Sequence, residues 1–270
     1  MIQKLVPEQY HRVFPLLGPD DAVNALSINA ILSGTNCGAV YADDPEQPRT
    51  ALIDQTGIIS FLVGDPENPA FLGDLDRFLD HQLGPDTLAS CGGDTFIAVL
   101  HNAAWQRALE PVLAGREPEG DEECYFTFAG DMPAPNRRAL PTGFAIRRID
   151  DALAANDDIA ECLLESWPSA EHFLAHGFGH AVMDGERPVS LAFSCAAWGG
   201  RQEINLLTFE DGDEGQGFAT QACAAWLAEA LHAGVTPHWT AMASNAASLH
   251  LARKLGFAET ARRPTIEFQF

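Results

Sequence analysis

The segment Glu214-Gly-Gln-Gly-Phe-Ala219 combines two closely spaced glycines with the start of a predicted helix. Glycine has no side chain, so a ligand can come close to the backbone at Gly215 and Gly217. Apolar residues then recur at helical spacing as far as about His232. The open N–H groups and the positive dipole end of a helix N-terminus bind phosphate. The segment therefore predicts a pyrophosphate site, with an ordinary turn before a helix as the alternative.

A second segment with chemical meaning starts at Asn245, after a predicted strand at residues 237–243. Asparagine is a preferred N-cap residue, and Gly256 suits the position just past a helix end. Between them, Leu251 and Leu255 have the spacing of one helix face. The sequence thus places an Asn-led helix one strand after the glycine-rich loop.

The rest of the C-terminal half alternates between strand-like and helix-like patterns. A first predicted strand at residues 143–149 is followed by a helical stretch at residues 152–166. Three more predicted strands follow, and tight-turn signals at residues 184–187 and at Gly199-Gly200 join them into an antiparallel meander. The remaining predicted strands of this half are residues 180–183, 189–198, 203–209 and 265–270.

Residues 1–139 run through a similar series with weaker patterns. Prolines within residues 132–141 disfavour helix and interrupt strand pairing, so this segment is predicted to link two domains. Because strand-like and helix-like patterns alternate in both halves, the fold class is α+β. The linker divides the chain into domains at residues 1–139 and 140–270. The predicted strands of the first domain are residues 37–42, two hairpin strands within 50–63, 95–100 and 124–129, and its predicted helices are residues 69–83 and 103–113.

The glycine-rich loop and the Asn-led helix together resemble the GNAT superfamily of acyl-CoA N-acyltransferases. The family's phosphate loop has the pattern Q/R-x-x-G-x-G/A, and residues 214–219 supply both small positions. Asn245 to Phe257 resembles the family helix that begins with Asn and ends in Leu-Gly-Phe. The resemblance implies two GNAT-like domains in tandem, each a mixed, mostly antiparallel sheet flanked by helices.

Further motifs resemble a bacterial GNAT subfamily in which a degenerate GNAT-like half precedes the functional one. This likeness covers nearly the whole chain and implies a degenerate domain at residues 1–139 and an acyl-CoA-binding domain at residues 140–270. Two aromatic residues of these motifs, Trp167 and Phe173, are predicted in the core, with an acceptor pocket as the alternative. The motifs are Gly38-Ala-Val-Tyr-Ala-Asp-Asp44, Gly64-Asp65, Trp167-Pro-Ser-Ala-Glu-His-Phe173, Gly177-Phe-Gly179 and Thr236-Pro-His-Trp239.

The resemblance implies acetyl-CoA as co-substrate and a primary amine as acceptor, and the leading hypothesis is an amine of a small molecule. Asn245 would contact the pantetheine arm, and backbone N–H groups at residues 207–209 would polarise the thioester oxygen. The predicted contacts with acetyl-CoA are Leu207, Thr208, Phe209, Glu214, Gly215, Gln216, Gly217, Phe218, Ala219, Thr220, Asn245 and Ser248.

Direct attack by an amine requires a base that takes a proton from the ammonium group. Glu203, at the start of the strand before the glycine-rich loop, is the first candidate, because the family often keeps an acid there. Glu210, at the other end of that strand, is the second candidate. The alternative for both is a solvated charge at a hairpin end.

Glu214 stands where the family usually has Arg or Gln, within the acidic stretch of residues 210–214. At an effective dielectric constant near 20 and a separation of about 8 Å, each carboxylate repels a phosphate charge by about 2 kcal/mol. Salt at about 1 M shortens the Debye length to about 3 Å and removes most of this repulsion. The affinity for CoA is therefore expected to hold or rise with added salt.

Ala252 occupies the position where many family members have a Tyr that protonates the leaving thiolate. A thiol pKa of about 8.5 makes the thiolate a tolerable leaving group, so transfer is still expected. His250 lies off the Ala252 direction and is predicted as a surface residue. Glu214 and Ala252 also fit the alternative function, a catalytically inactive acyl-CoA sensor or scaffold. A third hypothesis is an acetyltransferase acting on basic protein tails.

Composition limits the partners of the chain. The formal net charge is −22, and the only lysines are Lys4 and Lys254. Nucleic acid and anionic membranes are therefore not expected to bind. The negative charge would either attract cationic amines or only keep the protein soluble, as in a salty cytoplasm. No apolar run reaches the roughly 18 to 20 residues of a membrane span, and residues 1–14 have no secretory pattern, so a cytoplasmic protein is expected. The sequence makes no prediction of the oligomeric state.

Cysteine and histidine patterns favour neither metal binding nor cysteine catalysis. The six cysteines are scattered without a C-x-x-C pair and are expected to be buried thiols. His172, His176 and His180 have the spacing of one helix face, which would suit a metal site. Gly177 and Gly179 interrupt that helix, so no metal site is predicted.

Overall fold

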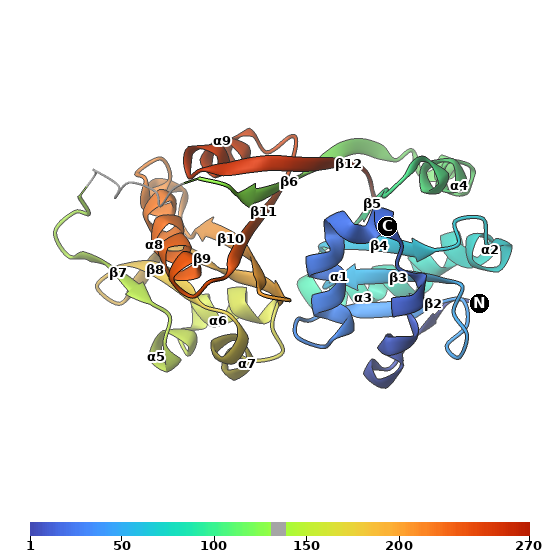
Figure 1. Cartoon of the computed structure of the whole chain (residues 1–270), viewed down its shortest axis with the longest axis horizontal. Coiled ribbons are helices and arrows are strands. Elements are labelled where there is room, and N and C mark those ends of the chain that lie inside the picture. The colour runs from blue at the N-terminus through green and yellow to red at the C-terminus, as the bar shows by residue number, and fades with distance from the viewer. Residues whose placement is uncertain (131–138) are drawn as a thin grey trace. The chain divides into compact units, whose positions relative to one another are not determined.

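The computed structural model describes residues 1–130 and 139–270, which form two compact units (Figure 1). The N-terminal unit comprises Met1–Cys124, Met242–Ser244 and Ala261–Phe270, and the C-terminal unit comprises Tyr125–Ala241 and Asn245–Thr260. Most of the predicted linker, residues 132–141, lies outside the described residues. The boundary at residue 139/140 stays a prediction.

The N-terminal unit is built on a mostly antiparallel sheet with the strand order β1-β2-β3-β4-β5-β12, in which only β4 and β5 are parallel neighbours. Its strands are β1 (Gln3–Lys4), β2 (Ala39–Ala42), β3 (Thr50–Gln55), β4 (Ile59–Gly64), β5 (Thr95–Val99), the start of β6 (Glu119–Phe128) and the end of β12 (Phe257–Gln269). Its α-helices are α1 (Ala25–Leu32), α2 (Pro69–Phe78), α3 (Gly84–Cys91) and α4 (Ala103–Leu113), with 3₁₀ turns at Pro7–Arg12, Phe14–Leu16, Pro19–Asn24 and Ala114–Arg116 and a π-helical turn at Leu79–Leu83.

Both faces of this sheet are covered, which explains the nearly continuous apolar runs of β3 and β4. Along β3, Leu52 packs into a cluster with α2 and α4, whereas its neighbour Ile53 packs into a second cluster with α1. Side chains of successive strand residues point to opposite faces, so the two clusters lie on the two sides of the sheet. All of β3 except its last residue is buried.

The end of β12 belongs to the core of the N-terminal unit. It pairs antiparallel with β5, from Thr265 opposite Val99 to Gln269 opposite Thr95. Phe268 is 7% exposed within the α2 and α4 cluster, and its ring centroid lies 5.1 Å from that of Phe96. The sheet of this unit is therefore completed by residues far along the chain.

The C-terminal unit has the strand order β6-β11-β10-β9-β8-β7, in which β10 and β11 are parallel. The predicted meander is present, and both Gly199 and Gly200 have positive φ, as a tight hairpin turn requires. The elements are β7 (Phe144–Arg148), α5 (Asp151–Ala154), α6 (Asp157–Leu164), α7 (Ala170–His176), β8 (Gly179–Asp184), β9 (Arg187–Trp198), β10 (Arg201–Thr208), a 3₁₀ turn (Asp211–Asp213), α8 (Phe218–His232), β11 (Thr236–Met242), α9 (Ala246–Lys254) and the first residues of β12.

Helices cover both faces of the meander. On one face, Trp167 and Phe173 are fully buried among side chains of α5, α6, β8 and β9. On the other, α8 packs against β8 and β9, and its Trp226 stacks on Phe178 at a centroid distance of 5.4 Å. The two motif aromatics Trp167 and Phe173 thus lie in the core, as predicted.

The α+β class, with a mostly antiparallel sheet flanked by helices, is confirmed, and the differences from the predicted elements have local causes. The final strand, predicted at residues 265–270, in fact begins at Phe257. Its first part was missed because residues 258–264 are mostly polar and do not alternate as strand residues usually do. The helix predicted at residues 69–83 continues into α3, because Pro85 stands in the first turn of α3, where its missing N–H costs nothing. The short helices α1 and α7 were not predicted.

Within residues 1–130 and 139–270, no helix is long and apolar enough to cross a bilayer.

Candidate functional site

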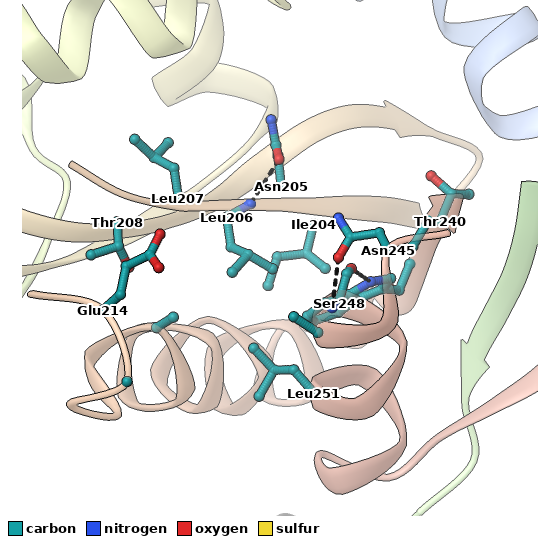
Figure 2. A pocket seen from close by; sticks show the side chains of 15 residues that line it. Ile204, Asn205, Leu206, Leu207, Thr208, Glu214, Thr240, Asn245, Ser248 and Leu251 are labelled. Atoms are coloured by element: carbon teal, nitrogen blue, oxygen red, sulfur yellow. Dashed lines mark hydrogen bonds between the residues drawn. The ribbon is translucent and has the colours of Figure 1, made fainter. Parts of the chain in front are cut away.

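Strands β10 and β11 separate after a short parallel contact and leave a cavity between them. Their paired positions run only from Arg201 opposite Thr236 to Glu203 opposite His238. A β-bulge between Glu203 and Ile204 shifts the register of β10 against β9 at the same point. Beyond it lies a cavity of about 470 Å³, with residues 204–208 of β10 on one side and 239–241 of β11 on the other (Figure 2).

The cavity brings together residues from four segments that the sequence analysis singled out. The glycine-rich loop and the start of α8 border it, and so does the first half of α9 (Figure 2). The predicted contacts that line it are Leu207, Thr208, Glu214, Gly215, Ala219, Asn245 and Ser248. The lining residues that were not predicted are Ile204, Asn205, Leu206, Trp239, Thr240, Ala241, Ala247 and Leu251.

A second cavity, of about 270 Å³, adjoins the first at the N-terminus of α8. The two linings share Thr208, Gly215, Ala219 and Leu251. The second lining adds the predicted residues Gly217, Phe218 and Thr220, together with Asp213, His250 and Lys254. An extended ligand can therefore run from the strand gap past the first turn of α8.

The N-terminus of α8 is open toward these cavities. Gly217 is its N-cap, with φ of 86°, and provides no side-chain hydrogen bond to the first turn. Gly215 has φ of 67°, a left-handed conformation that other residues rarely adopt. The first N–H groups of an α-helix have no partner within the helix, so those of α8 remain donors for an anion.

The corresponding helix of the N-terminal unit, which follows its fourth strand, is closed in the same region. The side chain of Asn68 caps α2 by accepting from Ala70 N, and Pro69 at the first helical position has no N–H. Asn68 is 1% exposed and also donates to Asp43 and Thr50, at 2.8 and 3.0 Å. The first-turn amides of α2 are thus capped or absent, in contrast to those of α8.

Helix α9 is held at its N-terminus by the predicted asparagine. The Asn245 Oδ1 accepts from Ser248 N at 3.0 Å, which leaves the Asn245 Nδ2 group as the donor toward a ligand carbonyl. The Ser248 hydroxyl accepts from Trp239 Nε1 at 3.0 Å and so ties α9 to β11. Ala252 is fully buried and lines neither cavity, so that position offers no proton donor to either cavity.

Main-chain donors on β10 face alternate edges of the strand. The Phe209 N–H donates to the Val189 carbonyl at 3.1 Å, so it points to β9. Because successive amides alternate, the Leu207 N–H also points to β9, and those of Leu206 and Thr208 point to the cavity. The Leu206 N–H is taken by Asn205 Oδ1 at 2.8 Å. Of the three predicted oxyanion donors, Thr208 is therefore the one that faces the cavity.

Glu203, the first candidate base, lies at the last paired position of β10 and β11, just before the strands separate. It is 9% exposed and is not among the residues that line the cavity. Burial raises the pKa of the Glu203 carboxyl above its usual value, and a hydrogen bond from Thr240 Oγ1 at 2.5 Å only partly offsets this. A carboxylate with a raised pKa is suited to accept a proton near neutral pH.

Glu210, the second candidate base, is a surface residue outside both linings. Its side chain is 64% exposed and pairs with Arg187 Nη1 at 3.3 Å. The same Arg187 Nη1 contacts Asp213 at 2.7 Å, and these carboxylates raise the pKa of Arg187. Arg187 therefore offsets the charge of Asp213 at the second cavity, while the carboxylate of Glu214 lies at the first, near Thr208 (Figure 2).

The remaining predicted contacts and the histidines lie as follows. Gln216 is an exposed loop residue that lines neither cavity, and Phe209 packs on the core cluster around Trp167.

His172 and His176 lie on α7, whereas His180 lies on β8 and contacts Glu229 at 3.3 Å. Among the residues that the structure describes, no group of three or more His, Cys, Asp or Glu is arranged to hold a metal.

Comparison with known proteins agrees with this architecture. Residues 20–264 match the family described as GNAT acetyltransferase. An uncharacterized N-acetyltransferase of Bacillus subtilis (strain 168), YdfB, is 26% identical over 261 residues, which is 95% of each chain. The crystal structure of a GCN5-related N-acetyltransferase-like protein from Streptococcus suis 89/1591 is 26% identical, with a TM-score of 0.65 over 97% of this chain and 99% of that one.

A more distant structure shows the same fold. A tandem GNAT protein from the clavulanic acid biosynthesis pathway is 10% identical, with a TM-score of 0.58 over 100% of this chain and 98% of that one. The family match spans all described elements from α1 to β11 and α9, including the open N-terminus of α8 and the Asn245 cap. The chain belongs to the GNAT acetyltransferase family.

Proposed function

We propose that the C-terminal unit transfers an acetyl group from acetyl-CoA to a primary amine of a small molecule by direct attack. The observation that carries this proposal is the uncapped N-terminus of α8, which opens onto two adjoining cavities beside a pair of separated strands. A diphosphate joined to a long, thin, amide-bearing arm fits this arrangement. An acyltransferase of this family needs both halves of that site.

Each part of the site has a role in holding acetyl-CoA. The first-turn amides of α8 would hold the pyrophosphate, and His250 and Lys254 border the same cavity with groups that can carry positive charge. Lys254 is one of only two lysines in the chain. Asn245 would bind a pantetheine carbonyl, and the Thr208 N–H would donate to the thioester oxygen, where negative charge develops during attack.

The acceptor and the setting follow from charge and from the cysteines. A net charge of −22 draws cationic amines toward the protein and disfavours nucleic acid and anionic membranes. All six cysteines are free thiols, which fits a reducing compartment, so we place the protein in the cytoplasm. The buried Glu203 would take the ammonium proton, and the thiolate would leave without a protein acid at Ala252.

The proposal is tested with acetyl-CoA and a panel of amines: ethanolamine, putrescine, spermidine, glycinamide and kanamycin. Thiol release is followed over time, acetylated products are identified by mass spectrometry, and CoA binding is measured separately by calorimetry. Turnover with at least one amine is expected. Binding of CoA without turnover on any amine would favour the inactive sensor. Ala252 and Glu214, which depart from the family pattern, fit that alternative. Absence of CoA binding at every ionic strength would reject both functions.

Replacing Glu214 with Gln is expected to tighten CoA binding about tenfold at low salt, because it removes one carboxylate from the lining next to the pyrophosphate site. The difference between the wild type and Glu214→Gln should shrink toward zero in about 1 M salt, where the Debye length is about 3 Å. Calorimetric titration with CoA across a salt series measures both effects.

Asp211→Asn is the matched control for this substitution. Asp211 is an exposed acid of the same loop, and it lines neither cavity. It should therefore change the affinity for CoA much less than Glu214→Gln does. Equal effects of the two variants would show that only the total charge of the loop matters, and no effect of either would place the pyrophosphate away from Glu214.

A further inference from the structure

The predicted base and the cavity are separated by one side chain. Glu203 is buried and does not line the cavity between β10 and β11, whereas Thr240 does. The Thr240 Oγ1 donates to Glu203 Oε1 at 2.5 Å. Both residues lie where the two strands separate, because His238 is the register partner of Glu203 and Thr240 follows two residues later on the same face of β11.

Two titratable groups near Glu203, Cys195 and His238, are neutral and do not compete for its proton. The Cys195 thiol donates to the Glu203 main-chain carbonyl at 3.5 Å, and burial raises its pKa well above the usual range, so it stays neutral. Burial and the nearby Arg201 lower the pKa of His238, so it is neutral at neutral pH as well. Thr240 is therefore the group whose hydrogen bond joins the Glu203 carboxylate to the cavity.

We propose that the Thr240 hydroxyl relays the substrate proton to Glu203. This inference rests on the proposed function. In one step, an N–H bond of the ammonium group breaks and its proton passes to Thr240 Oγ1, while the Thr240 hydroxyl proton passes to Glu203 Oε1. Thr240 ends unchanged, Glu203 becomes a neutral carboxylic acid, and the amine keeps the lone pair that attacks the thioester carbon.

A hydroxyl group suits this position because it donates and accepts at once. Its proton is already directed at the carboxylate, so its oxygen lone pairs remain for the ammonium group in the cavity. The relay also restricts the acceptor, because the reacting nitrogen must come within hydrogen-bond distance of Thr240 Oγ1. Thr240 thereby acts as a catalytic residue that touches the substrate, whereas Glu203 receives the proton from behind it.

Thr240→Val and Thr240→Ser test the relay directly. Valine keeps the shape of the side chain and removes the hydroxyl, while serine retains it. With acetyl-CoA and the fastest amine of the panel, Thr240→Val is expected to lower kcat about 100-fold, and Thr240→Ser to stay within about threefold of the wild type. Thr236→Val is the matched control, because Thr236 is an exposed residue of the same strand outside both cavities.

The pH–rate profile separates a relay from a simple effect on the base. The Thr240 hydrogen bond lowers the pKa of Glu203, so Thr240→Val should move the acid limb of the profile to higher pH. With a relay, the high-pH plateau of Thr240→Val also stays low. Recovery of the wild-type rate on that plateau would mean that Thr240 only tunes Glu203, and it would overturn the proposal.

Two measurements without turnover keep the relay distinct from the proposed function. Calorimetry should give the same CoA affinity for Thr240→Val and the wild type, which also shows that the variant folds. Infrared titration of the protein alone, with Glu203→Gln subtracted, should show a higher carboxyl pKa in Thr240→Val. An unchanged titration would mean that the hydrogen bond is absent in solution and would reject the relay. Wild-type protein that acetylates no amine of the panel would reject the proposed function itself.

Discussion

Glu203→Gln is expected to lower kcat by about 100-fold or more while leaving the affinity for CoA unchanged. The amide keeps the size of the side chain and can still accept from Thr240, but it takes up no proton. Glu203 lies outside both cavity linings, so its loss should not change the groups that contact CoA. Steady-state rates with the panel amines and calorimetry with CoA measure the two quantities separately.

The pH dependence of the wild type gives an independent test of Glu203. Burial raises the pKa of its carboxyl, and only the deprotonated form acts as a base. The value of kcat/KM should therefore fall as the pH is lowered through this raised pKa, and Glu203→Gln should lack that limb. Glu210→Gln tests the competing candidate. If Glu210→Gln abolishes transfer and Glu203→Gln does not, the base has been assigned to the wrong end of β10.

Phe268→Ala is expected to destabilise the N-terminal unit by about 3–5 kcal/mol, the usual cost of removing a buried phenyl ring from a core. Phe268 is 7% exposed, packs with Phe96 at a centroid distance of 5.1 Å, and carries the Arg116 guanidinium 5.0 Å from its ring centroid. The loss should appear in urea unfolding curves. It should also appear as faster hydrogen exchange in β5, since β5 pairs with this part of β12.

The matched control is Gln269→Ala, because Gln269 is an exposed neighbour on the same strand. It should change the free energy of unfolding by less than about 0.5 kcal/mol. Exchange that accelerates only in α8 and β9 after Phe268→Ala, with β5 unchanged, would contradict the assignment of residues 261–270 to the N-terminal unit.

The site was predictable where one short segment determines local geometry. The glycines at residues 215 and 217 require positive φ, and Asn245 caps the helix that it begins, so both features follow from neighbouring residues alone. The relation of Thr240 to Glu203 depends instead on the register of two strands that are parallel for only three residue pairs. No pattern within either strand encodes that register, so Thr240 was not predicted.

The edge that each β10 amide faces was not predictable for the same reason. Assigning residues 207–209 as oxyanion donors required knowledge of which edge each N–H faces. That direction depends on the register against β9, which the bulge after Glu203 shifts by one residue. The fold class followed from alternating strand and helix patterns, whereas the extent of β12 did not, because residues 258–264 are mostly exposed and polar and become a strand only through pairing with neighbours.

The order in which the ribosome makes this chain differs from the order in which its parts can be completed. β5 ends at Val99, but its antiparallel partner begins at Thr265, after the entire meander and both helices of the proposed acetyl-CoA site have been translated. A nascent chain therefore carries β5 with one open edge through most of its synthesis, and open edges invite pairing with other chains. Domains usually fold from the N-terminus as they emerge. Here the first half is finished only after the second half has been made.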